Sequence, residues 1–419
     1  MAKRIQALIT PEVLKWARED AGFALEEAAK AAQVPAGQLQ RWERGDAYPT
    51  LNQLRKLANK YKRPLAVFYL PKPPKDFQAM RDFRRATGES AGPESPPLRL
   101  AVRRAAYRRD VAIDLHGALG EEIAAFGFTA SPSDDAEEIA VRLRSLLQVT
   151  LSIQAAWKTP HEVFNRWRAL VEALGVLVFQ FPGVDIDEAR GFSIAENPLP
   201  VIAVNIRDSP RARAFSVLHE LVHVALRAGG LCDFQEGVGL RPDDQRIEAY
   251  CNRVAGAVLV PRRELIDDLV VRQHGRSAVW ADAELRQLSE RFGASREAVL
   301  RRLLIMNRTT ASFYQEKRRE FQREYQRLRE ASEGGPTPDR KALSQVGPSF
   351  ARLVLAGYNQ ERITSSRVSD YLEVRLNYLP KIEALLALRA VRSSPVSGLP
   401  TARGARTSRT YAGRSAWSA

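Results

Sequence analysis

The feature that most constrains the fold of this chain is the sequence HELVH at residues 219–223. On a helix, His219 and His223 lie one turn apart and project from the same face. Two imidazoles at this spacing can hold one divalent metal ion, typically zinc. Glu220 then lies beside the open coordination position, where a carboxylate can take a proton from a bound water molecule. The chain has only five histidines in 419 residues, so chance produces this motif in well under about one in a hundred such chains.

The residues around the motif predict a helix. Ser209 and Pro210 form a cap with proline in the first turn, and the glycines at 229–230 are expected to end the helix. Apolar residues recur at three- and four-residue steps and form a stripe to bury, namely Phe215, Leu218, Val222 and Leu226. The alternative interpretation is a pair of incidental histidines on an amphipathic helix.

A second predicted helix, residues 246–261, carries a candidate third ligand. Glu248 lies 25 residues after His223, so a helix–loop–helix hairpin could bring its carboxylate to the metal. Two histidines and one glutamate form a hydrolytic zinc set that leaves one position for water. On spacing alone, a solvated helix carboxylate is an equally good interpretation of Glu248.

The two helical segments together resemble the ImmA/IrrE family of metallopeptidases. The resemblance lies in RARAFSVLHELVHVALR and in IEAYCNRVAGAVLVP, where Glu248 precedes Asn252 by four residues and apolar residues run to Pro261. It implies that His219, His223 and Glu248 hold the metal and that Glu220 is the general base. The residues at Tyr250, Gly256 and Val260 depart from those frequent in the family, but none is a ligand or the base.

The resemblance also implies a substrate class and a metal. Members of the family act as anti-repressors that cut helix-turn-helix repressors, so we expect an endopeptidase with a protein substrate, an Xre-family repressor. Zn²⁺ is the metal that this ligand set favours, while Mn²⁺ or Fe²⁺ could occupy the same site.

The N-terminal region predicts a helix-turn-helix domain. Residues 11–70 divide into five short helices, with a tight turn at 33–35 before a third helix at 36–44. In this arrangement the third helix enters the major groove of DNA. Residues 25–70 resemble the lambda-repressor-like (Xre) family through Ala29, Val34, Leu39, Trp42, Glu43, Gly45, Pro49, Leu54 and Leu57.

The exposed positions of the third helix decide what this domain reads. Gln38, Gln40 and Arg41 could reach bases or phosphates of double-stranded DNA, whereas Ala36 and Gly37 are too small to contact base edges.

The two ends of the chain carry most of its positive charge. Residues 1–75 carry 14 Lys/Arg and 7 Asp/Glu, a net charge of +7. Residues 391–419 carry five Arg and no acid, so the ends hold 12 of the net +15. Basic ends favour nucleic acid as a partner. Alternatively, the charge only keeps the protein soluble, and the helix-turn-helix domain docks another protein.

Composition predicts a cytoplasmic protein without a membrane partner. No run of 18 apolar residues occurs, and the N-terminus has no apolar segment typical of a secretion signal. The two cysteines imply no disulfide framework.

The fold class expected is mainly α with a small β-sheet. An all-α, five-helix domain precedes an α+β zincin-like peptidase domain and a helical C-terminal extension. Strands are predicted at 175–181, near 191–195 and at 201–205. The predicted division is a helix-turn-helix domain at 1–75, a linker at 76–97, a helical connector at 98–159, a peptidase domain at 160–265, a helix-turn-helix-like extension at 266–310, a C-terminal helical region at 311–390 and a disordered basic tail at 391–419.

Two other functions remain open on the sequence. The chain could be a transcriptional regulator or antitoxin-like protein whose metal domain senses rather than cuts, although Glu220 argues against a dead enzyme. A structural zinc site is disfavoured, because such sites are usually closed by four protein ligands.

Overall fold

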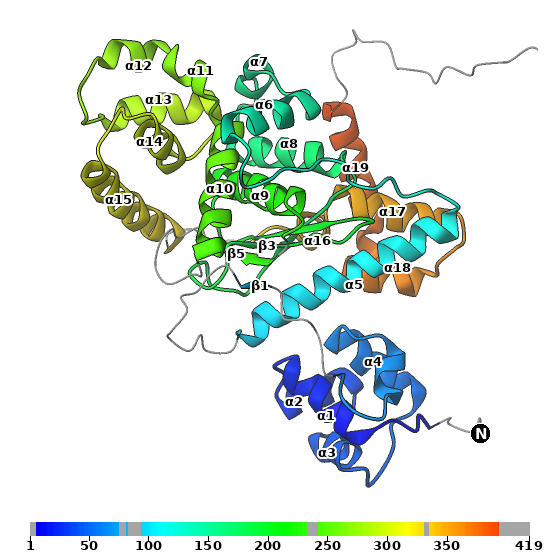
Figure 1. Ribbon diagram of the computed structural model, residues 1–419. Coiled ribbons are helices and arrows are strands. Elements are labelled where there is room, and N and C mark those ends of the chain that lie inside the picture. Colours follow the sequence, from blue (N-terminus) through cyan, green and yellow to red (C-terminus); the bar gives the residue numbers. More distant parts are fainter. Residues whose placement is uncertain are drawn as a thin grey trace, which may run out of the picture.

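The computed structural model describes residues 6–74, 81–82, 94–228, 230–232, 242–330 and 335–393. Helices dominate, and one small sheet lies in the middle of the larger part of the molecule (Figure 1). The fold class predicted from the sequence is confirmed. The predicted basic tail falls almost entirely outside the described residues, since the last described element ends at Ser393.

The helix-turn-helix domain has its own core. It contains α1 (Pro11–Asp20), α2 (Leu25–Ala32), α3 (Ala36–Arg44) and α4 (Leu51–Tyr61). Left-handed residues at Gln33 and Gly45 end α2 and α3, and Thr50 forms a capping box with Gln53 at the start of α4. The predicted fifth helix is a single 3-10 segment, Leu65–Tyr69.

The sheet has five strands in the order β1-β5-β3-β4-β2. The three longer strands, β2 (Leu177–Phe181), β3 (Gly191–Ile194) and β4 (Val201–Asn205), match the three strands predicted from the sequence. Strand β4 pairs in parallel with β2 and antiparallel with β3. Two short strands complete the sheet, β5 (Gly230–Cys232) beside β3 and β1 (Arg81–Asp82) beside β5.

Helices cover both faces of the sheet, which explains why β2 and β4 are buried at every position. Val178, Ile202 and Val204 belong to one apolar cluster, whereas Phe179 and Ala203 belong to the other, because neighbouring residues of a strand point to opposite faces. The first face packs against α8 (Pro160–Glu172) and α9 (Pro210–Ala225), with α10 (Pro242–Leu259) beyond. The second packs against α5 (Pro96–Leu119), α16 (Pro338–Val346) and α17 (Pro348–Asn359) (Figure 1).

The remaining helices surround these layers. They are α6 (Ala136–Leu146), α7 (Leu151–Ala155), α11 (Arg262–Ile266), α12 (Leu269–His274), α13 (Asp282–Phe292), α14 (Arg296–Ile305), α15 (Ala311–Glu330), α18 (Ser365–Leu372) and α19 (Leu379–Ser393), with a 3-10 turn at Leu376–Tyr378. None of the described helices is long and apolar enough to cross a lipid bilayer.

Two helix predictions need correction. The helical connector predicted at 98–159 is interrupted, because Gly120 adopts a left-handed conformation that ends α5, and α6 begins only after the Asp135 cap. The HELVH helix ends at Ala225, four residues before the predicted glycines, and Leu226 is its C-cap. Of those glycines, Gly229 lies outside the described residues and Gly230 begins β5.

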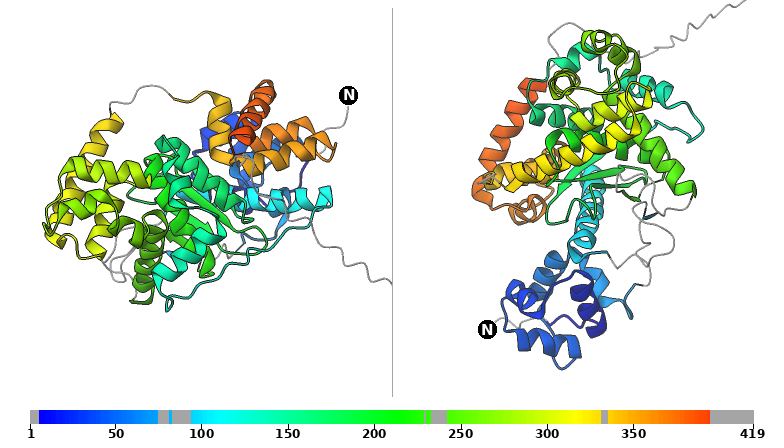
Figure 2. Two further views of the ribbon diagram at one scale, coloured as in Figure 1. Left: turned by 90° about the horizontal axis from the view of Figure 1, so that it is seen from above. Right: turned by 90° about the vertical axis from the view of Figure 1, so that its left-hand side faces the viewer.

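The helix-turn-helix domain lies beside α5 as a separate lobe (Figure 1, and the right-hand view of Figure 2). Asp20 at the end of α1 contacts Arg103 of α5 at 3.0 Å, and the same arginine donates to the Tyr61 carbonyl. Gly22 allows the close approach: a Cβ there would lie 1.9 Å from the Pro96 Cβ, and its φ of +70° disfavours other residues.

Glu373, just after α18, is the second contact between the lobes. Its carboxylate lies 3.0 Å from Lys62 of the helix-turn-helix domain, 3.4 Å from Arg108 and 3.8 Å from Arg104. Burial alone would raise the pKa of Glu373, but Arg108, Lys62 and Arg104 lower it to about 2. Because the folded pKa lies below the ordinary value, the contribution to stability is complete above about pH 4.5 and is lost as the pH falls toward about 2.

We predict that Glu373→Gln loosens the docking of the helix-turn-helix domain at neutral pH, because three partly buried cations lose their shared carboxylate. The radius of gyration from small-angle X-ray scattering should rise. Glu383→Gln, an exposed position on α19, serves as the matched control and should scatter like the wild type. Unchanged scattering of the Glu373 variant would show that docking depends on other contacts.

Candidate metal centre

Helix α9 carries the HELVH motif and is buried on nearly every side. Ser209 caps it by accepting from the Ala212 N–H at 3.2 Å, and Pro210 occupies the first turn. Apart from Phe215, the residues from Arg213 to Ala225 are all buried. A helix covered by a sheet and two further helices needs no polar outer face, which differs from the single apolar stripe predicted from the sequence.

The structure brings together the three residues that were predicted to hold a metal. The Nε2 atoms of His219 and His223 lie 3.1 Å apart. Glu248, on the neighbouring α10, places Oε2 3.2 Å from the Nε2 atom of His219 and Oε1 3.0 Å from that of His223. The three form a cluster of candidate metal ligands whose donor atoms lie within 4.8 Å of one another.

This donor set fits a divalent ion. Neighbouring ligand atoms around a tetrahedral zinc ion lie about 3.3 Å apart when the metal–nitrogen bonds are about 2.0–2.1 Å. The distances of 3.0–3.2 Å between the three side chains are close to that spacing. Two imidazoles and a carboxylate also approach this closely only when a proton or a cation lies among them. Two nitrogens and one carboxylate oxygen are ligands that zinc accepts, with one position left open.

Electrostatics distinguish the two imidazoles. Burial lowers the pKa of His219 to about 4 despite its contact with Glu248. Burial also acts to lower the pKa of His223, but hydrogen bonds to Cys251 and Glu248 raise it well above the ordinary value. The histidines in turn lower the pKa of Glu248 to about 2 against the effect of its burial. A metal ion is bound by the neutral form of each imidazole, so metal binding would displace any additional proton that His223 holds.

Glu220 directly follows His219 on α9, and its carboxylate packs against strand β3. A Cβ atom added at Gly191 of that strand would lie only 2.8 Å from Oε1 of Glu220 and 3.2 Å from the Ala203 carbonyl oxygen. Real Cβ atoms essentially never approach an oxygen this closely. The absence of a side chain at Gly191 therefore makes room for the Glu220 carboxylate.

Sequence reasoning missed three residues at this centre. Gly191 was noted only as part of a strand. Cys251 was considered only as one of two cysteines without a disulfide; it is fully buried, and its thiol contacts His223. The side-chain amide of Asn252 is buried, and neither of its polar atoms has a hydrogen-bond partner in the described parts of the chain. Cys251 and Asn252 follow Glu248 by three and four residues, a spacing that places all three on one helix face.

The centre is closed to solvent in this structure. His219, Glu220 and His223 are 0 % exposed, and Glu248 is 2 % exposed. A peptide can therefore reach these side chains only if part of the surrounding protein moves.

The predicted DNA-contacting residues lie far from this centre, on the recognition helix α3. Gln40 and Arg41 are exposed and Gln38 is half-buried, while Leu39 and Trp42 face the domain core. The contacts that dock the domain come from the ends of α1 and α4, and α3 lies on the side turned away from the body (Figure 1).

Two family models match the chain. The model of the M78 peptidases, described as the IrrE N-terminal-like domain, matches residues 171–304, which include the HELVH motif and Glu248. A helix-turn-helix model matches residues 14–68. No curated protein matches the chain. The molecule thus joins a DNA-binding type of helix-turn-helix domain to an IrrE-like domain of the metallopeptidase class, the fusion that the sequence resemblances predicted.

We predict that the purified protein binds about one equivalent of zinc and that His219→Ala, His223→Ala or Glu248→Ala each lowers this content strongly. Removing one of three ligands leaves too few donors for a stable site. Glu220→Gln should retain the metal. Metal content is measured by inductively coupled plasma mass spectrometry after dialysis, with circular dichroism to verify folding. Equal zinc content in wild type and all three ligand variants would contradict the ligand assignment.

Proposed function

We propose that this chain is a zinc-dependent endopeptidase that cleaves a helix-turn-helix repressor and so acts as an anti-repressor. The observation that carries the proposal is the convergence of His219, His223 and Glu248, with Glu220 directly after His219 on the same helix. The match of the same segment to the IrrE N-terminal-like domain supports it. Because repressors act on DNA inside the cell, the proposal also assigns the chain to the cytoplasm.

The proposed mechanism assigns a role to each of the four residues. His219, His223 and Glu248 would hold the metal ion. When bound, a divalent ion supplies Lewis-acid chemistry that acidifies water and polarises a carbonyl group. Glu220 takes the proton of the attacking water on a carboxylate oxygen and later delivers it to the nitrogen of the leaving amine. Gly191 leaves the space in which this carboxylate is positioned.

The substrate is proposed to bind as an added strand next to β3. Extended peptides bind protease sheets in this way through main-chain hydrogen bonds. Strand β3 is already paired on that side, but only at Gly191 and Phe192, which oppose Cys232 and Leu231 of β5. Two residue pairs make a weak ladder, so displacement of β5 is the least costly way to open the edge beside Glu220.

The helix-turn-helix domain is proposed to bring the enzyme to its substrate. The exposed side chains of Gln40 and Arg41, together with Gln38, could contact DNA beside a repressor operator. The same surface could instead dock the related domain of the repressor. Its orientation away from the body leaves it open to either partner.

The burial of the centre favours a second candidate function. Side chains that are 0–2 % exposed would also suit a regulator or antitoxin-like protein whose metal domain is sensory or structural. Glu220 favours the endopeptidase over the regulator, because a sensory metal domain has no need of a general base.

We predict that Glu220→Gln retains its metal but cleaves an Xre-family repressor at least about 100-fold more slowly than the wild type, the loss typical of a missing general base. Cleavage is followed by gel electrophoresis and mass spectrometry of the products. Equal rates in both proteins would exclude Glu220 as the base. Metal binding without cleavage of any candidate repressor by the wild type would favour the regulator.

A second variant tests the position of the carboxylate rather than its chemistry. Gly191→Ala keeps Glu220 but pushes its side chain aside, and a displacement of about 1 Å can lower the rate by about 100-fold. Its zinc content should be unchanged. Gly127→Ala is the matched control, because no atom lies within 4 Å of a Cβ at that position.

We predict that replacing Gln38, Gln40 and Arg41 with alanine weakens binding to operator DNA. The slope of the logarithm of the binding constant against the logarithm of salt concentration should fall in magnitude by about one, the value for one lost phosphate contact. Binding is measured by fluorescence anisotropy at several salt concentrations. Lys30→Ala on α2 is an exposed control that also removes one positive charge. If DNA affinity is unchanged while repressor cleavage falls, the surface docks protein instead.

A further inference from the structure

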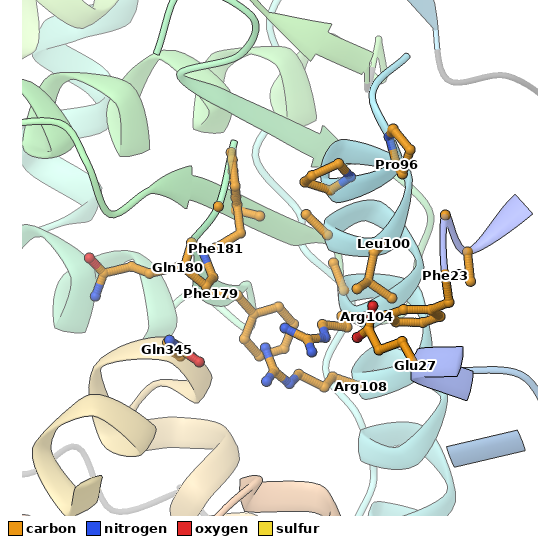
Figure 3. Close-up of a pocket in the computed structure, with 18 residues that line it drawn as sticks. Phe23, Glu27, Pro96, Leu100, Arg104, Arg108, Phe179, Gln180, Phe181 and Gln345 are labelled. Atoms are coloured by element: carbon orange, nitrogen blue, oxygen red, sulfur yellow. The ribbon is translucent and has the colours of Figure 1, made fainter. Parts of the chain in front are cut away.

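A cavity of about 250 Å³ lies between the helix-turn-helix domain and the body, and Phe179 and Ala203 line it from the face of the sheet opposite α9. Its walls come from the loop after α1, from α5, from β2 and from the end of α16, so both domains contribute (Figure 3). Ligand cavities are usually about 300–1,000 Å³, which makes this one suitable for a small molecule only.

One face of α5 gives the cavity two chemically different ends. Pro96, Leu100, Arg104 and Arg108 follow one another at four-residue steps and therefore line the same side of the helix. Figure 3 shows Pro96 and Leu100 at one end and the two guanidinium groups at the other, beside Phe179. The Arg108 guanidinium lies 5.4 Å from the centre of the Phe179 ring. The cavity thus combines an apolar end with a basic end.

The basic end carries more positive charge than its own residues neutralise. Lys62, Arg104 and Arg108 all lie within 4 Å of a single carboxylate, that of Glu373. Glu27 also lines the cavity, but its carboxylate contacts Lys60 at 2.8 Å. Three cations against Glu373 leave a local charge of about +2, and burial lowers the pKa of both Lys62 and Arg108.

Arg104 offers a donor that the protein does not use. Its Nε atom is buried and has no hydrogen-bond partner among the described residues, since Glu373 lies 3.8 Å away. By contrast, Arg99 and Arg103 on the same helix donate to backbone carbonyls, and neither lines the cavity. A buried guanidinium N–H without an acceptor is costly, and an oxyanion would satisfy it.

We propose that this cavity binds a small organic anion, whose oxyanion pairs with Arg104 and Arg108 and whose apolar body lies against Leu100 and Phe179. A planar guanidinium binds a carboxylate or a phosphate equally well, so the oxyanion of the ligand can be either group. Because the walls come from two domains, the bound anion also holds the helix-turn-helix domain against α5.

The test measures binding of four probes to the full-length protein by isothermal titration calorimetry and ligand-observed NMR. The probes are benzoate, phenyl phosphate, the uncharged analogue benzamide, and acetate, which lacks the apolar body. Benzoate or phenyl phosphate should bind at least about tenfold more tightly than benzamide and acetate. The tighter of the two anions identifies the carboxylate or the phosphate as the natural group.

Three variants locate the site. Arg104→Gln should weaken binding of the preferred anion at least about tenfold, while Arg99→Gln, which removes a charge from the same helix outside the cavity, should not. Leu100→Trp fills the apolar end and keeps every charge, so it should also remove binding even if Arg104→Gln disturbs the docking of the domains. Absence of binding to the wild type, equal binding of benzoate and benzamide, or wild-type affinity in both Arg104→Gln and Leu100→Trp would each overturn the proposal.

Discussion

The burial of helix α9 between the sheet and α10 is the constraint on which the body of this protein depends. Two imidazoles and a carboxylate at 0 % exposure are costly to desolvate unless other groups compensate them. Glu248 from α10 and Cys251 beside it provide those contacts, and Gly191 of β3 leaves room for Glu220. The candidate metal centre therefore forms only when helix, neighbouring helix and strand are all in place.

Helix α5 connects this buried layer with the outer domain. One side of it packs on the face of the sheet opposite α9, through residues such as Leu98 and Val102. Another side meets the helix-turn-helix domain through ion pairs with Asp20 and through the cluster around Glu373. The first contact is apolar and insensitive to salt, whereas the second is charged and partly exposed. The lobes are thus joined by the part of the structure that solution conditions change most easily.

The two functional surfaces differ in accessibility. The recognition helix α3 presents Gln40 and Arg41 to solvent and faces away from the body. The metal centre is closed, and the strand next to it, β5, is held by two residue pairs with β3 and two with β1. Strand β1 belongs to the segment that connects the two domains.

The sequence by itself determined the elements whose signals are local. The spacing of His219 and His223, the three strands of the central sheet and the helix-turn-helix framework follow from residues a few positions apart, which the backbone places without help from the rest of the chain. Spacing left Glu248 undecided, because a carboxylate on a second helix reaches the histidines only if the hairpin closes. Tertiary structure alone decided that Gly191 faces Glu220 and that Cys251 contacts His223. It also decided that Glu373 contacts three cations, Lys62 at the end of α4 and both Arg104 and Arg108 of α5. These contacts join residues far apart in the chain, so no local pattern records them.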